Sequence, residues 1–133
     1  MLALVPPKLL PSGCKTLPLE AISDIDFIIP GEGSNYDIGR ILRTAGVRPR
    51  VKYSVSDDYA AVAMAECGLG MTIVPELILK GIGGNRAAVE LEPACTRTIG
   101  IAERSIGTGS PACAAFMRFT ENWVKRHSED AIQ

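Results

Sequence analysis

Hydrophobic and polar residues follow one another along this chain in blocks that predict strands and helices in turn. Strands are expected where short apolar runs end in proline, glycine or polar residues, and helices where apolar residues recur three or four positions apart. The expected strands cover 2–5, 26–30, 49–55, 71–74, 88–91 and 96–102. The expected helices cover 17–23, 34–45, 57–67, 76–81 and 110–125. This alternation predicts an α/β fold, with a doubly wound and mostly parallel sheet flanked by helices.

Two of these strands have patterns that indicate their place in the sheet. The run DFIIP at 26–30 holds consecutive apolar residues, so we expect it to be buried on both faces, as in a parallel sheet. In 49–55, apolar side chains alternate with Lys52 and Ser54, which leaves one face of the strand wetter than the other. This second pattern predicts a strand nearer the edge.

The loops that follow these two strands are candidates for a ligand site. Ligands of open α/β sheets bind outside the carboxyl ends of the strands, where 31–36 and the pair Ser56 and Asp57 are expected. Each loop leads into a helix N-terminus, whose N–H groups and positive dipole end attract carboxylates and hydroxyls. Ser34, Asn35, Ser56 and Asp57 are also good N-cap residues, so capping alone is an alternative explanation of their presence.

Composition and charge narrow the range of partners. The 133 residues are 47% hydrophobic and 22% charged, which is ordinary for a single globular domain. The formal net charge is −1 and Lys and Arg do not cluster, so direct contact with nucleic acid is not expected. The N-terminal MLALVPPKLLPSG lacks the basic start of a signal peptide and the length of a membrane span. We therefore expect a cytoplasmic protein without a membrane partner.

Catalytic, metal and cofactor chemistry are not indicated. The four cysteines form no CxxC pair and the single histidine is His127, so neither a metal site nor a cofactor is predicted. Cys67 and Cys113 lie among small apolar residues of expected helices, where we expect them to be buried. Asp57 and Asp58 are adjacent and would point in different directions on a helix, which is poor geometry for paired acid and base catalysis. The chain is not expected to be an enzyme.

The run from 53 to 75, YSVSDDYAAVAMAECGLGMTIVP, carries a more specific pattern. An acidic pair opens a helix, which ends in small residues, Gly-x-Gly, apolar residues and proline. This order resembles the most recognisable segment in the effector-binding domain of the LysR-type transcriptional regulators. The matching positions are Ala65, Gly68, Gly70, Met71, Ile73, Val74 and Pro75.

Three flanking segments are similar to the same family. LALVPPKLLPSG, at 2–13, resembles a strand that leads to a proline-containing loop. LEAISDIDFIIPGEGSNYDIGRILRTAGVRP, at 19–49, resembles the short turn, strand, glycine/serine loop and helix that follow. SPACAAFMRFTENW, at 110–123, resembles the closing helix, so the resemblance covers nearly the whole chain.

The resemblance implies a periplasmic-binding-protein-like fold of type 2, in which two α/β lobes hold a small molecule between them. Residues 2–93 would form the second lobe, 94–127 would supply the return strand and C-terminal helix that belong to the first lobe, and 128–133 would be a tail. Most of the first lobe would be missing. DNA would be reached only through a winged helix-turn-helix domain that is not in this chain.

The resemblance also implies where an effector binds. The effector-facing residues would be Gly33, Ser34, Asn35, Tyr36, Ser56 and Asp57, with Thr72 and Pro75 lining or supporting the cleft. Amides and hydroxyls there would hold a small organic, anionic molecule, while Asp57 would favour a donor group on it. Packing alone would also explain Thr72 and Pro75. Binding would shift the population of lobe or subunit arrangements and so control transcription.

The final expected helix predicts self-association. Its apolar stripe would be exposed if the lobe it belongs to is missing, and large exposed apolar patches usually find a partner. The stripe consists of Ala112, Phe116, Phe119 and Trp123. We therefore expect a homo-oligomer, either a dimer or a swapped arrangement. Two other functions stay open, a solute-binding protein of the periplasmic-binding type and a remnant with only an oligomerisation role.

Overall fold

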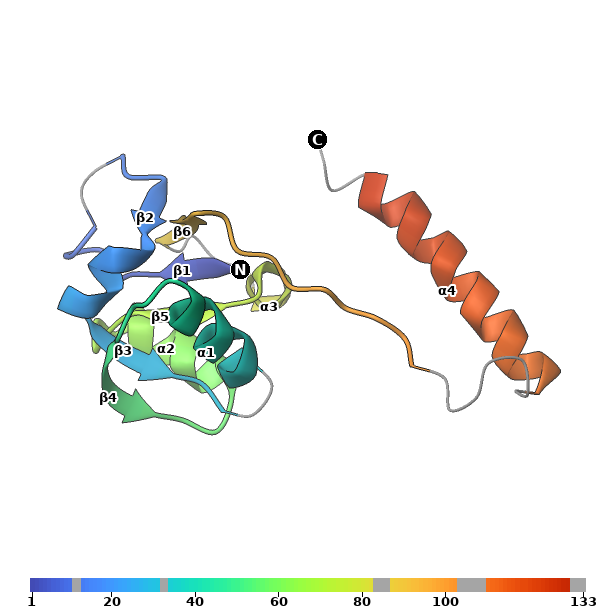
Figure 1. Ribbon diagram of the computed structural model, residues 1–133, viewed down its shortest axis with the longest axis horizontal. Helices are drawn as coiled ribbons and strands as arrows, with labels where there is room; N and C mark the ends of the chain where they lie inside the picture. The colour runs from blue at the N-terminus through green and yellow to red at the C-terminus, as the bar shows by residue number, and fades with distance from the viewer. Residues whose placement is uncertain (11–12, 32–33, 83–86, 103–109, 130–133) are drawn as a thin grey trace. The chain divides into compact units, whose positions relative to one another are not determined.

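The computed structural model describes residues 1–10, 13–31, 34–82, 87–102 and 110–129 (Figure 1). The chain forms two compact units, Met1–Arg97 and Thr98–Gln133. Among the described residues, every strand lies in the first unit, and the long helix α4 (Pro111–Glu129) lies in the second.

The first unit alternates strands and helices mostly as the sequence pattern predicts. Its strands are β1 (Leu2–Leu4), β2 (Thr16–Pro18), β3 (Asp26–Ile29), β4 (Arg50–Ser54), β5 (Thr72–Val74) and β6 (Ala88–Glu92). Its helices are the 3-10 helix η1 (Leu19–Asp24) and the α-helices α1 (Ser34–Thr44), α2 (Asp58–Glu66) and α3 (Glu76–Ile82).

The strands form a mixed sheet. A four-stranded sheet has the order β2-β6-β1-β5, and β3 pairs with β4 in a second, two-stranded sheet. The two sheets are joined at Phe27 and Met71 by a parallel bridge, and the Met71 N–H donates to the Asp26 carbonyl at 2.8 Å. The β2/β6 and β3/β4 pairs are parallel, whereas β1 runs antiparallel to both of its neighbours. Because β4 pairs with β3 alone, it lies at the edge, as its alternating pattern predicts.

Helices cover both faces of this sheet, which confirms the doubly wound arrangement. Consecutive residues of β5 point to opposite faces, so that Ile73 belongs to one buried cluster and Val74 to the other. The first cluster contains residues of α1 and η1, and the second contains residues of α2. The apolar residues that recur at helical spacing along α1 face the core, since Ile38, Ile41 and Leu42 are at most 8% exposed and Ala45, just after the helix, is partly buried.

Two glycines explain the Gly-x-Gly pattern between α2 and β5. Gly68 has a φ of +79°, the left-handed conformation that commonly ends a helix. Gly70 lies so close to β3 that a Cβ atom there would be 2.6 Å from the Asp26 carbonyl oxygen. The first glycine therefore turns the chain and the second lets β5 enter the sheet beside β3.

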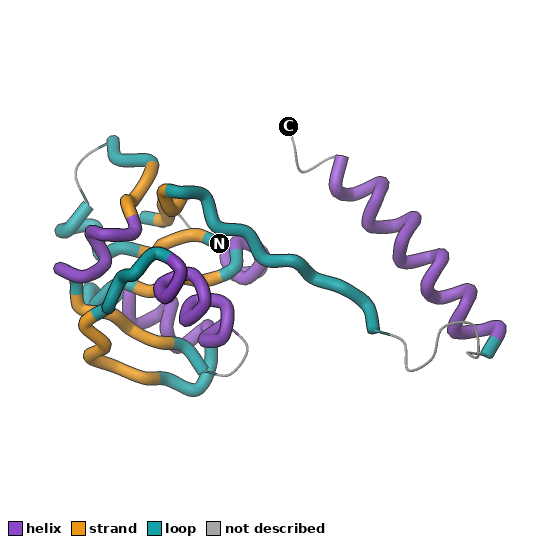
Figure 2. Tube along the Cα trace, viewed as in Figure 1, coloured by secondary structure: helices purple, strands orange, loops and turns teal. Residues whose placement is uncertain are grey.

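Two features differ from the sequence prediction. Residues 96–102 do not form the expected strand, and Figure 2 draws them as loop. Ile99 and Ile101, whose alternation suggested a strand, are exposed, since no strand pairs with this segment in the described chain. The helical turn expected within 17–23 is present as η1, but it is preceded by β2, a three-residue strand that the pattern missed.

The second unit is dominated by α4, the amphipathic helix that the stripe predicts. Phe116 and Phe119 are each 62% exposed and Trp123 is 47% exposed, so the second unit by itself does not cover the stripe. Cys113 is half-buried in α4, and the expectation that Cys67 is buried is wrong, because Cys67 is exposed at the C-cap of α2. None of the described helices is both long and apolar enough to cross a membrane.

Candidate functional site

The two loops singled out by the sequence meet at one edge of the sheet. The Val55 N–H donates to the Ile29 carbonyl at 3.1 Å, which extends the β3/β4 pairing up to the loops. Beyond it the backbones nearly touch, since a Cβ atom on Gly31 would be 1.9 Å from the Ser56 carbonyl oxygen. The parallel pairing of β3 with β4 thus places the beginnings of α1 and α2 side by side.

A hydrogen bond joins the two helix starts directly. The Ser34 hydroxyl, at the first residue of α1, donates to Asp58 Oδ2 at the first residue of α2, over 2.9 Å. Ser34 is only 2% exposed. The other carboxylate oxygen, Asp58 Oδ1, is buried and has no hydrogen-bond partner among the described residues. The sequence did not identify Asp58 as a site residue. Its position directly after the predicted cap Asp57 was the signal that could have indicated it.

Asp57 caps α2, as one of its two sequence interpretations predicts. Asp57 Oδ1 accepts the Ala60 N–H at 2.8 Å, and the Ser56 hydroxyl donates to Asp57 Oδ2 at 3.3 Å. Both side chains are exposed, so capping leaves them accessible to a ligand. Asp57 and Asp58 have separate partners, the Ala60 N–H and the Ser34 hydroxyl respectively.

The remaining predicted residues differ in exposure. Asn35 is exposed and Tyr36 is 72% exposed on the first turn of α1, whereas Gly33 lies outside the described residues. Thr72 is completely buried in β5, and Pro75 is buried directly after that strand. These last two residues are therefore packed inside the first unit and do not face solvent.

Asp37, on the first turn of α1, is another charged residue near the site that the sequence did not identify. The Asp37 side chain is 16% exposed and binds Arg97 Nε at 3.2 Å and Arg40 Nη2 at 3.6 Å. Arg97 is the last residue of the first unit. Because Asp37 and Arg97 are far apart in the sequence, no local pattern pairs them. The ion pair fastens the end of this unit to the helix that opens at Ser34.

The site therefore offers hydrogen bonds rather than reactive groups. Its accessible groups are the N–H groups at two helix starts, the exposed hydroxyl of Ser56 and the carboxylate of Asp57, while Ser34 and Asp58 hold the two helix starts together. Among the described residues, no three His, Cys, Asp or Glu side chains are placed to hold a metal ion. Such an arrangement can bind a small polar molecule.

Comparison with known families decides what kind of domain this is. The family model described as LysR substrate binding domain matches residues 1–125. The chain belongs to this family. A LysR substrate-binding domain is a regulatory, effector-binding module with a periplasmic-binding-protein-like α/β fold, and this agrees with the expectation that the chain is not an enzyme.

A solved structure supports the fold of this LysR domain. The structure of CbnR, a LysR family transcriptional regulator, matches with a TM-score of 0.53 and 23% identity, over 66% of this chain and 32% of that chain. This LysR domain thus spans about a third of the length of CbnR. No curated protein was found to match the sequence.

Proposed function

We propose that this LysR domain senses a small organic anion and controls transcription through a DNA-binding domain that is not in residues 1–133. The observation that carries the proposal is the junction of two helix starts, fixed by the hydrogen bond from Ser34 to Asp58. Each helix start has a positive dipole end and first-turn N–H groups that no carbonyl within the helix accepts, and both features attract an anion. The exposed hydroxyl of Ser56 adds a donor beside them.

The acidic side chains at this junction select among anions. Asp57 uses one oxygen for its cap, and Asp58 uses one for Ser34. A fully anionic molecule would be repelled by these carboxylates, whereas a molecule with a hydroxyl or amino group next to its carboxylate would satisfy them. We therefore propose a hydroxy acid or an amino acid as the effector class.

We also propose which lobe each part of the chain belongs to. Residues 2–93 form the second lobe, 94–127 belong with the first lobe, and 128–133 are a tail. The effector contacts both lobes of an intact cytoplasmic regulator, and its higher affinity for one arrangement shifts the population towards it. The exposed Ile99, Ile101 and stripe of α4 support this assignment, because they are apolar surfaces that another lobe would bury.

A thermal-shift screen of the full chain tests effector binding. The compounds are small carboxylic acids, hydroxy acids and amino acids, each with its neutral amide. We expect a hydroxy or amino acid to raise the unfolding temperature, and its amide to have a smaller effect. Each variant is compared with its own ligand-free unfolding temperature, because Asp57→Ala also removes a helix cap.

Matched variants locate the binding. Ser34→Ala and Asp57→Ala should reduce the ligand shift, while Ser23→Ala and Asp24→Ala, exposed residues of η1, should leave it unchanged. If the ligand raises the unfolding temperature of both site variants as much as that of the parent, Ser34 and Asp57 do not bind it. A screen in which no acid stabilises the chain would count against sensing by it.

The exposed stripe of α4 supports homo-oligomerisation as the second role. Phe116, Phe119 and Trp123 recur at helical spacing and are each at least 47% exposed. A second copy of α4 would bury these side chains. Size-exclusion chromatography with light scattering should give a dimer that Phe116→Ser/Phe119→Ser converts to a monomer, and a monomeric parent chain would contradict this role.

A further inference from the structure

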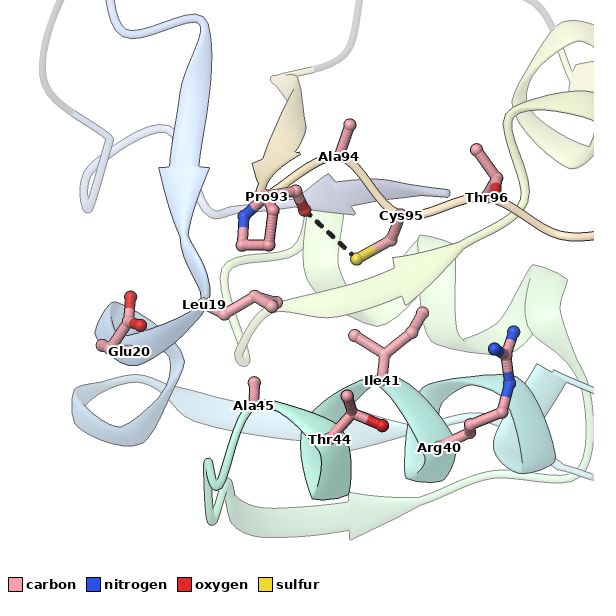
Figure 3. A pocket seen from close by; sticks show the side chains of 10 residues that line it. All are labelled: Leu19, Glu20, Arg40, Ile41, Thr44, Ala45, Pro93, Ala94, Cys95 and Thr96. Atoms are coloured by element: carbon pink, nitrogen blue, oxygen red, sulfur yellow. Dashed lines mark hydrogen bonds between the residues drawn. The ribbon is translucent and has the colours of Figure 1, made fainter.

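A pocket of about 390 Å³ lies between α1, η1 and the segment that follows β6 (Figure 3). Its apolar walls include Leu19 of η1, Ile41 of α1 and Pro93 after β6. The volume falls within the range of small-molecule pockets in proteins. The residues that line it include none of those at the junction of the two loops.

The ends of this pocket are polar and differ in charge. Figure 3 shows Arg40 and Thr96 at one end and Glu20 at the other, with Leu19 and Ile41 between them. Arg40 Nη2 is 3.6 Å from Asp37 Oδ1, while Arg97 Nε holds Asp37 Oδ2 more closely at 3.2 Å. One carboxylate thus faces two guanidinium groups, so this end of the pocket carries a net positive charge.

We propose that this pocket binds a small monocarboxylate with an apolar body. The carboxylate accepts hydrogen bonds from Arg40, whose planar guanidinium has five N–H donors and a loose contact with Asp37. The apolar body lies between Leu19, Ile41 and Pro93. Glu20 at the far end disfavours a second carboxylate, which restricts the ligand to a single negative charge.

The position of the pocket gives such a ligand a regulatory role. One wall, Pro93 to Thr96, leads from β6 towards the end of the first unit at Arg97. Polar contacts that hold this wall include the hydrogen bond from the N-terminal amine of Met1 to the Cys95 carbonyl at 2.8 Å and the Arg97–Asp37 ion pair. A ligand that joins this wall to α1 would hold the end of the first unit against α1, independently of the effector at Ser34.

Calorimetric titration of the full chain with 4-phenylbutanoate and its neutral analogue 4-phenylbutanol tests the site. We expect the acid to bind more tightly than the alcohol, and Arg40→Gln to weaken acid binding about tenfold by removing a charge-assisted interaction. Arg43→Gln is the matched control, because Arg43 is exposed on the same helix and does not line the pocket. Equal binding of acid and alcohol, equal effects of the two variants, or no binding at all would overturn the proposal.

Two further readouts place the acid in this pocket. Ser34→Ala should leave acid binding unchanged, and its loss in this variant would move the acid to the effector site and overturn the proposal. In a Cys14→Ser/Cys67→Ser/Cys113→Ser chain, the acid should slow maleimide labelling of Cys95, which lines the pocket. Acid binding without protection of Cys95 would show that the ligand lies elsewhere.

Discussion

The Ser34 hydroxyl donates a hydrogen bond to Asp58 Oδ2 at 2.9 Å, and this contact joins the first residue of α1 to the first residue of α2. The two residues are 24 positions apart in the sequence and meet because β3 and β4 run parallel. Ser34 is nearly inaccessible and one oxygen of Asp58 is buried, so the bond lies beneath the surface of the candidate site. Several properties of the domain depend on this junction.

Loss of the Ser34 hydroxyl should destabilise the fold. Ser34→Ala leaves the part-buried carboxylate of Asp58 without its donor, and an unsatisfied buried polar group typically costs about 1–3 kcal/mol. Urea unfolding should show this loss. Ser23→Ala, at an exposed position of η1, should change the free energy of unfolding by less than about 0.5 kcal/mol. Equal stabilities of the two variants would mean that the hydrogen bond contributes nothing.

Gly31 should tolerate no side chain. A Cβ atom at this position would be 1.9 Å from the Ser56 carbonyl oxygen, so Gly31→Ala must push the two loops apart. We expect a loss of about 1–3 kcal/mol in urea unfolding, as for other overpacked sites. Gly81→Ala is the control, because nothing lies within 4 Å of a Cβ atom there and alanine favours the helix α3 by about 0.5–1 kcal/mol. A Gly31→Ala domain as stable as the parent would contradict the close approach.

Thr72 should be replaceable by an apolar residue of the same shape. Thr72 is completely buried and its hydroxyl oxygen has no hydrogen-bond partner among the described residues. Thr72→Val removes this unsatisfied group and should stabilise the domain by about 1 kcal/mol, whereas Thr72→Ser keeps the hydroxyl, loses the methyl group and should destabilise it. Thermal unfolding of the two variants checks both signs. A destabilised Thr72→Val domain would indicate that the hydroxyl is bound.

Asp26 should make stability depend on pH in the acid range. Its carboxylate binds Lys52 Nζ at 2.8 Å and Arg50 Nε at 2.7 Å, at the start of the β3/β4 pair. The hydrogen bond from Lys52, helped by the charge of Arg50, holds the pKa of Asp26 below its ordinary value of 3.8. Because the folded-state pKa is the lower one, the stabilisation is complete above the unfolded value and is lost as the pH falls through the folded value.

Asp26→Asn should remove that dependence. The variant should be less stable than the parent at neutral pH, and the difference should shrink as the pH falls from about 4, the ordinary pKa of an aspartate, through the lower pKa of folded Asp26. Urea unfolding at a series of pH values gives the comparison. Asp24→Asn, at an exposed neighbouring position, serves as the control. A difference between Asp26→Asn and the parent that does not change with pH would show that the charge of Asp26 is irrelevant.

The sequence predicts most of the first unit because its signals are local. Proline and glycine mark the ends of elements, and the stripe of α1 predicts which of its residues are buried. The orientation of β1 was not predicted, since three apolar residues fit an antiparallel neighbour as well as a parallel one. Residues 96–102 were misjudged because alternation describes which side chains share a face, and does not supply a pairing strand.

The sequence predicts which loops form the candidate site, but it does not predict the contacts between their side chains. Strand ends and cap residues identify 31–36 and Ser56 with Asp57 from the sequence alone. The roles of Asp58 and Asp37 depend on partners brought near by the fold, Ser34 and Arg97 respectively, and no local pattern encodes such a pairing. The cap at Asp57 shows that one residue can fill its structural role and still face solvent.

An NMR titration of the isotopically labelled full chain tests whether an effector binds where α1 and α2 begin. The ligand is the acid that gives the largest thermal shift in the screen. We predict that the amide signals that move most belong to 34–37 and 56–59, and that Ser34→Ala weakens this response. If saturable signal changes occur only in other parts of the chain and the amides of 34–37 and 56–59 do not move, the effector does not bind where α1 and α2 begin.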